Sequence, residues 1–355
     1  MNQDAILRSL KRYPDQTFPQ NLVGIAKYGA RLGYEGPSNV RLSLKNHLSV
    51  LTQPEVVDKD IKGDIELDRN QIFDQLPPTY YISPLGLVPK KKSGVITGWR
   101  RIHDLSAPRG RSVNDGIPKH YGTMVYENFQ HALRLIAKKG RGTKLVKRDL
   151  KSAFRFIPVS PSDQWLLMYR WKGKVYVEKF LPFGLRTAPR IFNLFSEAIH
   201  WIMELYGWTV CHYIDDFLTI LHPDEDIHKA SAEFDNICKS IGFEIEHRKD
   251  VEGTTVEFLG LEIDTMAMEA RLPQDKHLRA FRAVRDTLGR AYIPFHELEN
   301  LLGFLSFCCA VLPLGRPFLR NIFNLLDQKT RHLMRIRITK AAKCDLQWWM
   351  ILFTQ

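Results

Sequence analysis

Two adjacent aspartates, Asp215 and Asp216, suggest chemistry by their type and position in this 355-residue chain. They lie between two apolar segments, 209–211 and 218–221, which are rich in β-branched and aromatic residues and are predicted to be strands. Aspartate is favoured in the tight turn between such strands. Burying carboxylates at the tip of an apolar hairpin is costly unless a positive partner meets them, and a divalent cation is such a partner. A solvated hairpin turn is the alternative.

The elements around this pair follow an order that predicts a split βαβ, ferredoxin-like sheet. It places Asp149 at the end of the first strand and Asp215 in the central hairpin. In chain order, the predicted elements are a strand over 144–149, a helix from a Thr187 N-cap to about 206, the aspartate hairpin, a helix over 226–241 ended by Gly242, and strands over 243–245 and 258–263.

A basic β-hairpin is predicted upstream of the sheet. Residues 80–89 form an extended stretch, residues 90–94 a lysine-rich turn, and residues 99–105 the returning strand. After Pro273 the pattern becomes helical and predicts a helical lobe.

The net charge of +12 is concentrated in two windows. Residues 86–111 and 138–151 each contain seven Lys or Arg and one acidic residue, so each window is +6 and together they hold the whole excess. Such a concentrated positive field suits a polyphosphate partner, with a solvated basic surface as the alternative.

Composition and cysteine usage indicate a folded protein of a reducing compartment. The chain is 44% hydrophobic and 25% charged, which is typical of globular domains. The five cysteines show no CxxC spacing, which argues against a disulfide framework or a zinc site. The N-terminus has no signal-peptide pattern, and the longest apolar run, 301–314, is too short to span a bilayer. We expect an intracellular protein, nuclear or cytoplasmic, without a membrane partner.

Several short motifs follow one another over about residues 80–330. They are Asp149-Leu-Lys-Ser-Ala-Phe154, Leu181-Pro-Phe-Gly-Leu185 followed by Ala188-Pro189 and Phe192, Tyr213-Ile-Asp-Asp216, and Phe258-Leu-Gly260. Over these residues the chain resembles reverse transcriptases, because the motifs occur in that family's order and spacing. Segments 83–90, 105–108 and 112–117 look most like eukaryotic retrotransposon enzymes, of DIRS type first and gypsy type second.

The resemblance implies an α+β right-hand polymerase with fingers, a ferredoxin-like palm and a helical thumb. The expected division of the chain is an N-terminal extension over 1–75, fingers over 76–148, a palm over 149–268 with a fingers insertion near 155–180, a thumb over 269–330, and the start of a connection segment over 331–355.

The resemblance also implies that Asp149, Asp215 and Asp216 are catalytic residues and metal ligands. Phosphoryl transfer requires positioning and charge neutralisation, and two ions about 4 Å apart clamp the attacking and leaving oxygens. Carboxylates suit two Mg²⁺ ions, with Mn²⁺ possible. Neighbouring residues on a strand point to opposite faces, so Asp215 ranks before Asp216.

Two residues of the basic hairpin are expected to bind the triphosphate of an incoming nucleotide. Arg100 offers a bidentate fork and Lys91 a point charge. Lys90 or Lys92 could replace Lys91, because residues 95–98 look inserted relative to the family.

Four further residues are expected at the nucleotide by resemblance. Phe154 would pack under the sugar and exclude a 2′-hydroxyl, which favours DNA as product, and a core phenylalanine is the alternative. Phe183 and Gly184 occupy a loop in which glycine permits close approach to nucleotide and template. Lys249 is a candidate to protonate pyrophosphate, and a plain surface lysine is equally consistent with its neighbours.

The expected function is RNA-directed and DNA-directed DNA synthesis by nucleotidyl transfer to a primer 3′-hydroxyl. The expected partners are an RNA template, a DNA primer–template duplex and deoxynucleotides, with a ribonuclease H or recombinase module in the parent element. A domesticated, non-catalytic nucleic-acid-binding protein is the alternative. An RNA-dependent RNA polymerase is a second rival, and Phe154 argues against it.

Overall fold

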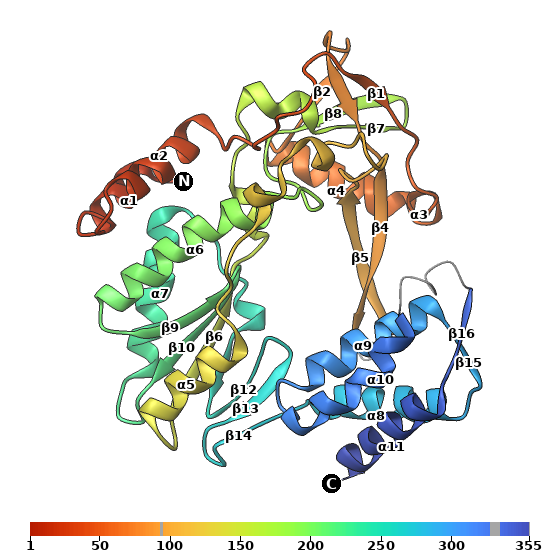
Figure 1. The fold of residues 1–355 in the computed structure, drawn as a ribbon. Coiled ribbons are helices and arrows are strands. Elements are labelled where there is room, and N and C mark those ends of the chain that lie inside the picture. Colours follow the sequence, from red (N-terminus) through yellow and green to blue (C-terminus); the bar gives the residue numbers. More distant parts are fainter. Residues whose placement is uncertain (93–94, 327–333, 355) are drawn as a thin grey trace. The chain divides into compact units, whose positions relative to one another are not determined.

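The structure is a computed structural model that describes residues 1–92, 95–326 and 334–354. It is a mixed α+β protein (Figure 1) whose chain forms two compact units. The first unit comprises residues 1–127, 148–219 and 226–250, and the second comprises 128–147, 220–225 and 251–355.

The first unit contains a five-stranded sheet in the order β1-β3-β7-β8-β2. These strands are β1 (Arg41–Ser43), β2 (Asn70–Phe73), β3 (Tyr80–Ile82), β7 (Met168–Trp171) and β8 (Lys174–Glu178). Helices of the same unit are α1 (Gln3–Ser9), α2 (Thr17–Tyr28), α3 (Ser49–Thr52), α4 (Pro54–Glu66), α6 (Ala188–Leu205) and α7 (Ile227–Ile241).

The predicted basic hairpin is confirmed as β4 (Leu85–Lys92) paired antiparallel with β5 (Val95–His103). The predicted place of its turn is wrong, because residues 90–92 continue β4, and residues 93–94 lie outside the described chain. The register shifts between Lys90 and Lys91, which places one extra β5 residue opposite this point.

A four-stranded sheet with the order β11-β6-β10-β9 carries the predicted aspartates. Its strands are β6 (Lys144–Asp149), β9 (Thr209–Tyr213), β10 (Asp216–Leu221) and β11 (Val251–Gly253). In chain order they are connected as β6-α6-β9-β10-α7-β11, which confirms the ferredoxin-like topology. The end of β6 and the start of β10 are joined by a hydrogen bond from Leu150 N to Asp215 O at 3.2 Å.

Two details of the sequence prediction are wrong in this region. The fourth strand is β11 and not residues 243–245, of which only Ile245 forms an isolated bridge, to Leu150. Residues 258–263 are not one strand, because they contain the end of one strand, a turn and the start of the next strand. Thr187 occupies the predicted N-cap position of α6, but its side chain makes no capping hydrogen bond, and its hydroxyl donates to Leu32 O at 3.2 Å instead.

Helices α6 and α7 pack against the sheet through apolar faces spaced at helical intervals (Figure 1). Phe217 of β10 contacts Phe234 of α7 with ring centroids 5.1 Å apart. Helix α7 begins after Asp226, whose side chain accepts from His228 N at 2.8 Å, and, as predicted, it ends before Gly242, which has φ +106°. These contacts hold the hairpin between β9 and β10 on a rigid layer.

The second unit contains a three-stranded sheet and the helical region predicted after Pro273. Helix α9 buries Leu298, Leu302 and Leu305 along one face. No helix among the described residues is long and apolar enough to cross a membrane. The elements of this unit not yet named are α5 (Phe129–Lys139), β12 (Thr255–Phe258), β13 (Leu261–Asp264), β14 (Glu269–Arg271), α8 (Gln274–Leu288), β15 (Tyr292–Pro294), α9 (Phe295–Cys308), α10 (Arg320–Phe323), β16 (Arg335–Arg337) and α11 (Lys340–Thr354).

Candidate active site

The turn between β9 and β10 presents Asp215 on a strained backbone. Ile214, the residue before it, has φ +57°, a left-handed conformation that is an outlier for a β-branched side chain. Ser196 of α6 is fully buried, and its hydroxyl donates to Ile214 O at 2.6 Å. The hydroxyl therefore helps to hold the turn in this conformation. Asp216 is already the first residue of β10.

Asp149 lies beside this turn at the end of β6. Its carbonyl accepts from Glu246 N at 2.9 Å, and the next residue, Leu150, is bonded to Asp215 O. Burial, together with the negative charges of Asp149 and Asp216, raises the pKa of Asp215 to about 6. The carboxylates therefore leave negative charge that a cation would neutralise, and such a donor set fits Mg²⁺.

One cationic side chain, that of Lys249, already lies at these carboxylates. Its Nζ donates to Asp149 Oδ2 at 2.5 Å from a 3₁₀ helix over His247–Lys249. This hydrogen bond, with the charges of the three aspartates, raises the pKa of Lys249. The sequence prediction left Lys249 between a proton donor and a plain surface lysine, and the structure brings it to the carboxylates.

A cavity of about 880 Å³ in the first unit adjoins Asp149 and Asp215. Phe154, Phe183, Arg100 and Lys249 also line it, whereas Asp216 and Gly184 are not among its lining residues. The structure thus brings most of the predicted site residues together. The side chain of Lys91 lies outside the described chain, while Lys90 lines the cavity.

Three side chains that line this cavity contact one another in sequence: Phe154, Phe183 and Arg100. The rings of Phe154 and Phe183 have centroids 5.3 Å apart. The guanidinium of Arg100 lies over the Phe183 ring at 5.2 Å, a cation–π contact that orients the side chain of Arg100. Phe154 also contacts Phe192 of α6 edge-on at 5.7 Å, so its ring is held from both sides.

The structure gives a reason for glycine at position 184 that differs from the predicted one. Its φ is +112°, and a Cβ at this position would lie 2.1 Å from the carbonyl oxygen of His103. Asn114 Nδ2 donates to Gly184 O at 2.8 Å and fixes the loop on its other side. The close approach that glycine permits here is to the backbone of β5, and a role at the nucleotide stays a prediction.

A buried ionic network in the cavity wall was not predicted from the sequence. Glu178 of β8 is 3% exposed and pairs with Arg155, whose Nη2 also lies 2.9 Å from Asp64 Oδ2. Arg101 of β5 pairs with Asp64 and lies 3.9 Å from Glu178. The network joins α4, β5 and β8 to the 3₁₀ helix over Ala153–Phe156 that carries Phe154.

Burial governs the protonation of the histidine beside this network. His103 is 2% exposed with its Nδ1 3.7 Å from Glu178 Oε1, yet burial lowers its pKa to about 4. The imidazole is therefore neutral near pH 7, and the two arginines balance the two acids. The sequence held one sign of this network, because Arg155 directly follows the predicted site residue Phe154. Only the fold shows that Arg155 pairs with Glu178 and Asp64.

Some of the positive charge in the two basic windows is paired internally. Arg101 is buried in the network above. In the second window, Lys139 lies 3.1 Å from Glu225, Arg148 3.5 Å from Asp250, and Lys151 2.9 Å from Glu244. The field available to a polyphosphate is therefore smaller than the count of basic residues suggests.

Comparison with known proteins identifies a matching family and related sequences. Residues 88–263 match the family described as "Reverse transcriptase (RNA-dependent DNA polymerase)". The Pro-Pol polyprotein of Simian foamy virus type 1 is 23% identical over 279 residues, covering 76% of this chain and 21% of that protein. The Transposon Tf2-3 polyprotein of Schizosaccharomyces pombe is 27% identical over 299 residues, covering 79% and 22%.

Solved structures of a foamy viral protease–reverse transcriptase share the fold. The complex with double-stranded DNA aligns with a TM-score of 0.66 at 17% identity, covering 99% of this chain and 60% of that chain. The complex with an RNA/DNA hybrid aligns with a TM-score of 0.64 at 18% identity, covering 99% and 46%.

The fold is that of a right-hand polymerase. Residues 88–263 form a reverse transcriptase domain of the retroelement and retroviral type. The chain spans about a fifth of the length of the curated relatives it matches.

Proposed function

We propose that this chain catalyses RNA-directed and DNA-directed DNA synthesis by transferring deoxynucleotides to a primer 3′-hydroxyl. The observation that carries the proposal is the meeting of Asp149, Asp215 and Lys249 at one cavity of a reverse transcriptase domain. The 3′-oxygen forms a bond to the α-phosphorus, and the bond to the pyrophosphate oxygen breaks.

Asp149 and Asp215, with Asp216 beside them, would hold two Mg²⁺ ions, or Mn²⁺ in their place. Burial and the two neighbouring carboxylates raise the pKa of Asp215, and this excess of negative charge supports the assignment. Bound divalent ions supply charge neutralisation at the attacking and leaving oxygens.

The remaining cavity residues have roles that follow from their chemistry. Arg100, held over Phe183, forks onto the triphosphate, with Lys90 or Lys91 adding a point charge. Phe154 closes the space where a 2′-hydroxyl would project. Lys249 carries a proton near neutral pH and donates it to the leaving pyrophosphate.

The proposed partners are an RNA template, a primer–template duplex and deoxynucleotides. The solved structures of similar proteins are complexes with double-stranded DNA and with an RNA/DNA hybrid, and the basic windows suit phosphate backbones. The proposed source is a DIRS-type element, with a gypsy-type element second. The proposed location is intracellular, and the parent protein would carry a ribonuclease H or recombinase module.

The test is primer extension on an RNA template with deoxynucleotides and Mg²⁺, using wild type and Asp215→Asn. We expect extension by wild type and a loss of at least about a hundredfold in the variant. Duplex binding, measured in parallel, should persist in the variant and weaken steeply with salt. Wild-type binding without extension would instead favour the non-catalytic alternative, and extension by the variant would contradict the assignment of Asp215.

A further inference from the structure

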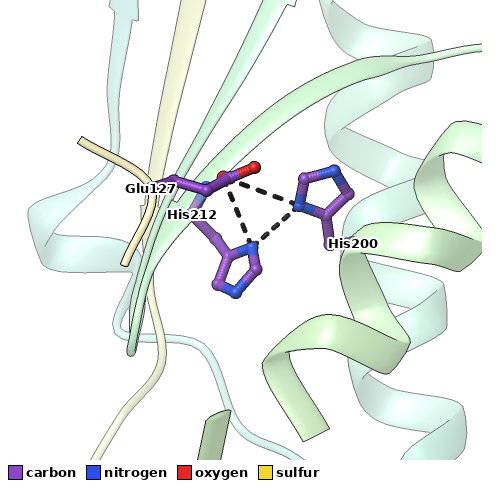
Figure 2. A group of neighbouring side chains, drawn as sticks. All are labelled: Glu127, His200 and His212. Carbon is purple, nitrogen blue, oxygen red and sulfur yellow. Dashed lines mark hydrogen bonds and ion pairs between the residues drawn. The ribbon is translucent and has the colours of Figure 1, made fainter. Parts of the chain in front are cut away.

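A second group of ligand side chains lies outside the cavity and has no part in the proposed chemistry. It consists of Glu127, just before α5, His200 on α6 and His212 on β9 (Figure 2). The two Nδ1 atoms are 2.8 Å apart. Glu127 Oε2 lies 3.7 Å from His200 Nδ1 and 3.6 Å from His212 Nδ1. Figure 2 shows the three groups directed toward one point.

These three separations match the donor spacing around one small cation. A point in the plane of the three atoms and equidistant from them would lie about 2.0 Å from each, close to the Zn–N and Zn–O bond lengths of roughly 2.0–2.2 Å. Magnesium has similar bond lengths but prefers oxygen donors, so two imidazoles favour a transition metal.

Contacts around the group prepare one imidazole to bind a metal. His200 Nε2 lies 3.3 Å from Glu204 Oε1, a contact that favours a ring proton on Nε2 and with it a free lone pair on Nδ1. Carboxylates in this position commonly orient metal-binding histidines. The backbone N–H of His212 donates to Glu127 Oε2 at 2.6 Å and holds the carboxylate against β9.

The surroundings combine burial with access. His212 is 7% exposed, so its imidazole is held within the fold. A cavity of about 310 Å³ borders all three ligands. Tyr13, Asn193 and Glu197 also line it, which leaves room for a water or a further ligand at a fourth position.

We propose that Glu127, His200 and His212 bind one transition-metal ion of the zinc class. None of the three ligands is a cysteine, which is why the cysteine spacing gave no sign of the site. The ion would tie α6 to β9. Ser196, which holds the Ile214 turn, lies one helical turn before His200, and Asp215 lies three residues after His212. The site is thus structural, and it supports the catalytic hairpin from outside the cavity.

The test uses the full chain, freed of metal by a chelator and titrated with Zn²⁺, and with Co²⁺ as a spectroscopic probe. We expect one tightly bound ion, a raised melting temperature, and Co²⁺ absorption bands typical of nitrogen and oxygen ligands. The double variant D149N/D215N should keep this ion. Its result distinguishes this site from the proposed magnesium site and does not depend on whether the proposed function is correct.

Variants then assign the ligands. H200N, H212N and E127Q should each lose the ion, and E204Q should bind it about 10- to 100-fold more weakly. His222, an exposed histidine 3.3 Å from Asp224, provides the matched control, and H222N should bind normally. E127Q and E204Q change less buried side chains, which keeps the test open if H212N does not fold. The proposal is overturned if wild type binds no ion below about 10 µM, or if folded H200N and E127Q keep it, in which case the histidines form only a hydrogen bond.

Discussion

Lys249 Nζ lies 2.5 Å from Asp149 Oδ2, although the two residues are 100 positions apart in the chain. The ion pair places an ammonium group where negative charge from three aspartates accumulates. A lysine held in this way keeps its proton near neutral pH, as the proposed donation to pyrophosphate requires.

Lys249→Gln should slow nucleotide addition by about a hundredfold if Lys249 is the general acid. The pH–rate profile from single-turnover extension should also lose the fall in rate at high pH that reports deprotonation of the donor. Lys172, which lies 2.7 Å from Asp58 and does not line the cavity, is the matched lysine–aspartate control. An equal slowing in Lys172→Gln and Lys249→Gln would contradict the assignment.

Asp215→Asn should make the metal-free protein more stable above pH 6. The folded-state pKa of about 6 lies above the ordinary value of 3.8, so the stability contributed by the bound proton is fully present below 3.8 and lost as the pH rises through 6. The full effect is about 3 kcal/mol, of which about 1 kcal/mol develops between pH 5 and pH 7.5.

Urea unfolding in EDTA at these two pH values measures the effect, because the difference between wild type and variant cancels other titrating groups. Wild type should be the less stable protein at pH 7.5, and the gap should narrow at pH 5. If the difference in unfolding free energy between wild type and variant grew toward low pH, the folded-state pKa of Asp215 would not be raised.

Phe154→Ala should raise ribonucleotide incorporation. The ring is fixed between Phe183 and Phe192, and its removal opens space for a 2′-hydroxyl, so discrimination in kcat/KM should fall at least about tenfold. Phe156 lies on the same 3₁₀ helix, packs on Phe243 and does not line the cavity. Phe156→Ala should therefore leave sugar selectivity unchanged, and a shared loss would point to a general distortion.

Glu178→Gln should destabilise the first unit by about 3 kcal/mol or more, because it leaves Arg101 and Arg155 buried beside an uncharged amide. Urea unfolding reports the change. The control is Glu66→Gln, which removes an exposed pair with Lys62 at 4.0 Å and should cost under about 0.5 kcal/mol. Similar small costs in both variants would mean that the network does not hold the cavity wall.

Gly184→Ala should destabilise the protein by at least about 3 kcal/mol, because both its φ and the His103 carbonyl oppose a Cβ. Gly173 has φ +79°, and nothing lies within 4 Å of the position that a Cβ would take there, so Gly173→Ala should cost only about 1 kcal/mol. The difference in unfolding free energy isolates the steric contact. Equal costs would show that the loop moves away from β5.

Local patterns in the sequence predicted much of the fold. Apolar spacing located α6, α7 and the hairpin, and Gly242 marked the end of α7, because the residues that decide these elements are close together in the chain. The same patterns misplaced the fourth strand of the ferredoxin-like sheet, since β11 pairs with β6 across about a hundred positions. The boundaries of the five expected parts of the chain stay a prediction.

By itself, the sequence determined the polymerase fold class and the aspartates worth examining, because motif order and residue type are written along the chain. Only the tertiary structure decided which side chains meet them. It brought Lys249 to Asp149, enclosed Glu178 with two arginines, and gathered Glu127, His200 and His212. The physical reason is that burial and long-range pairing set charge and donor geometry, and neither is encoded in the spacing of a short motif.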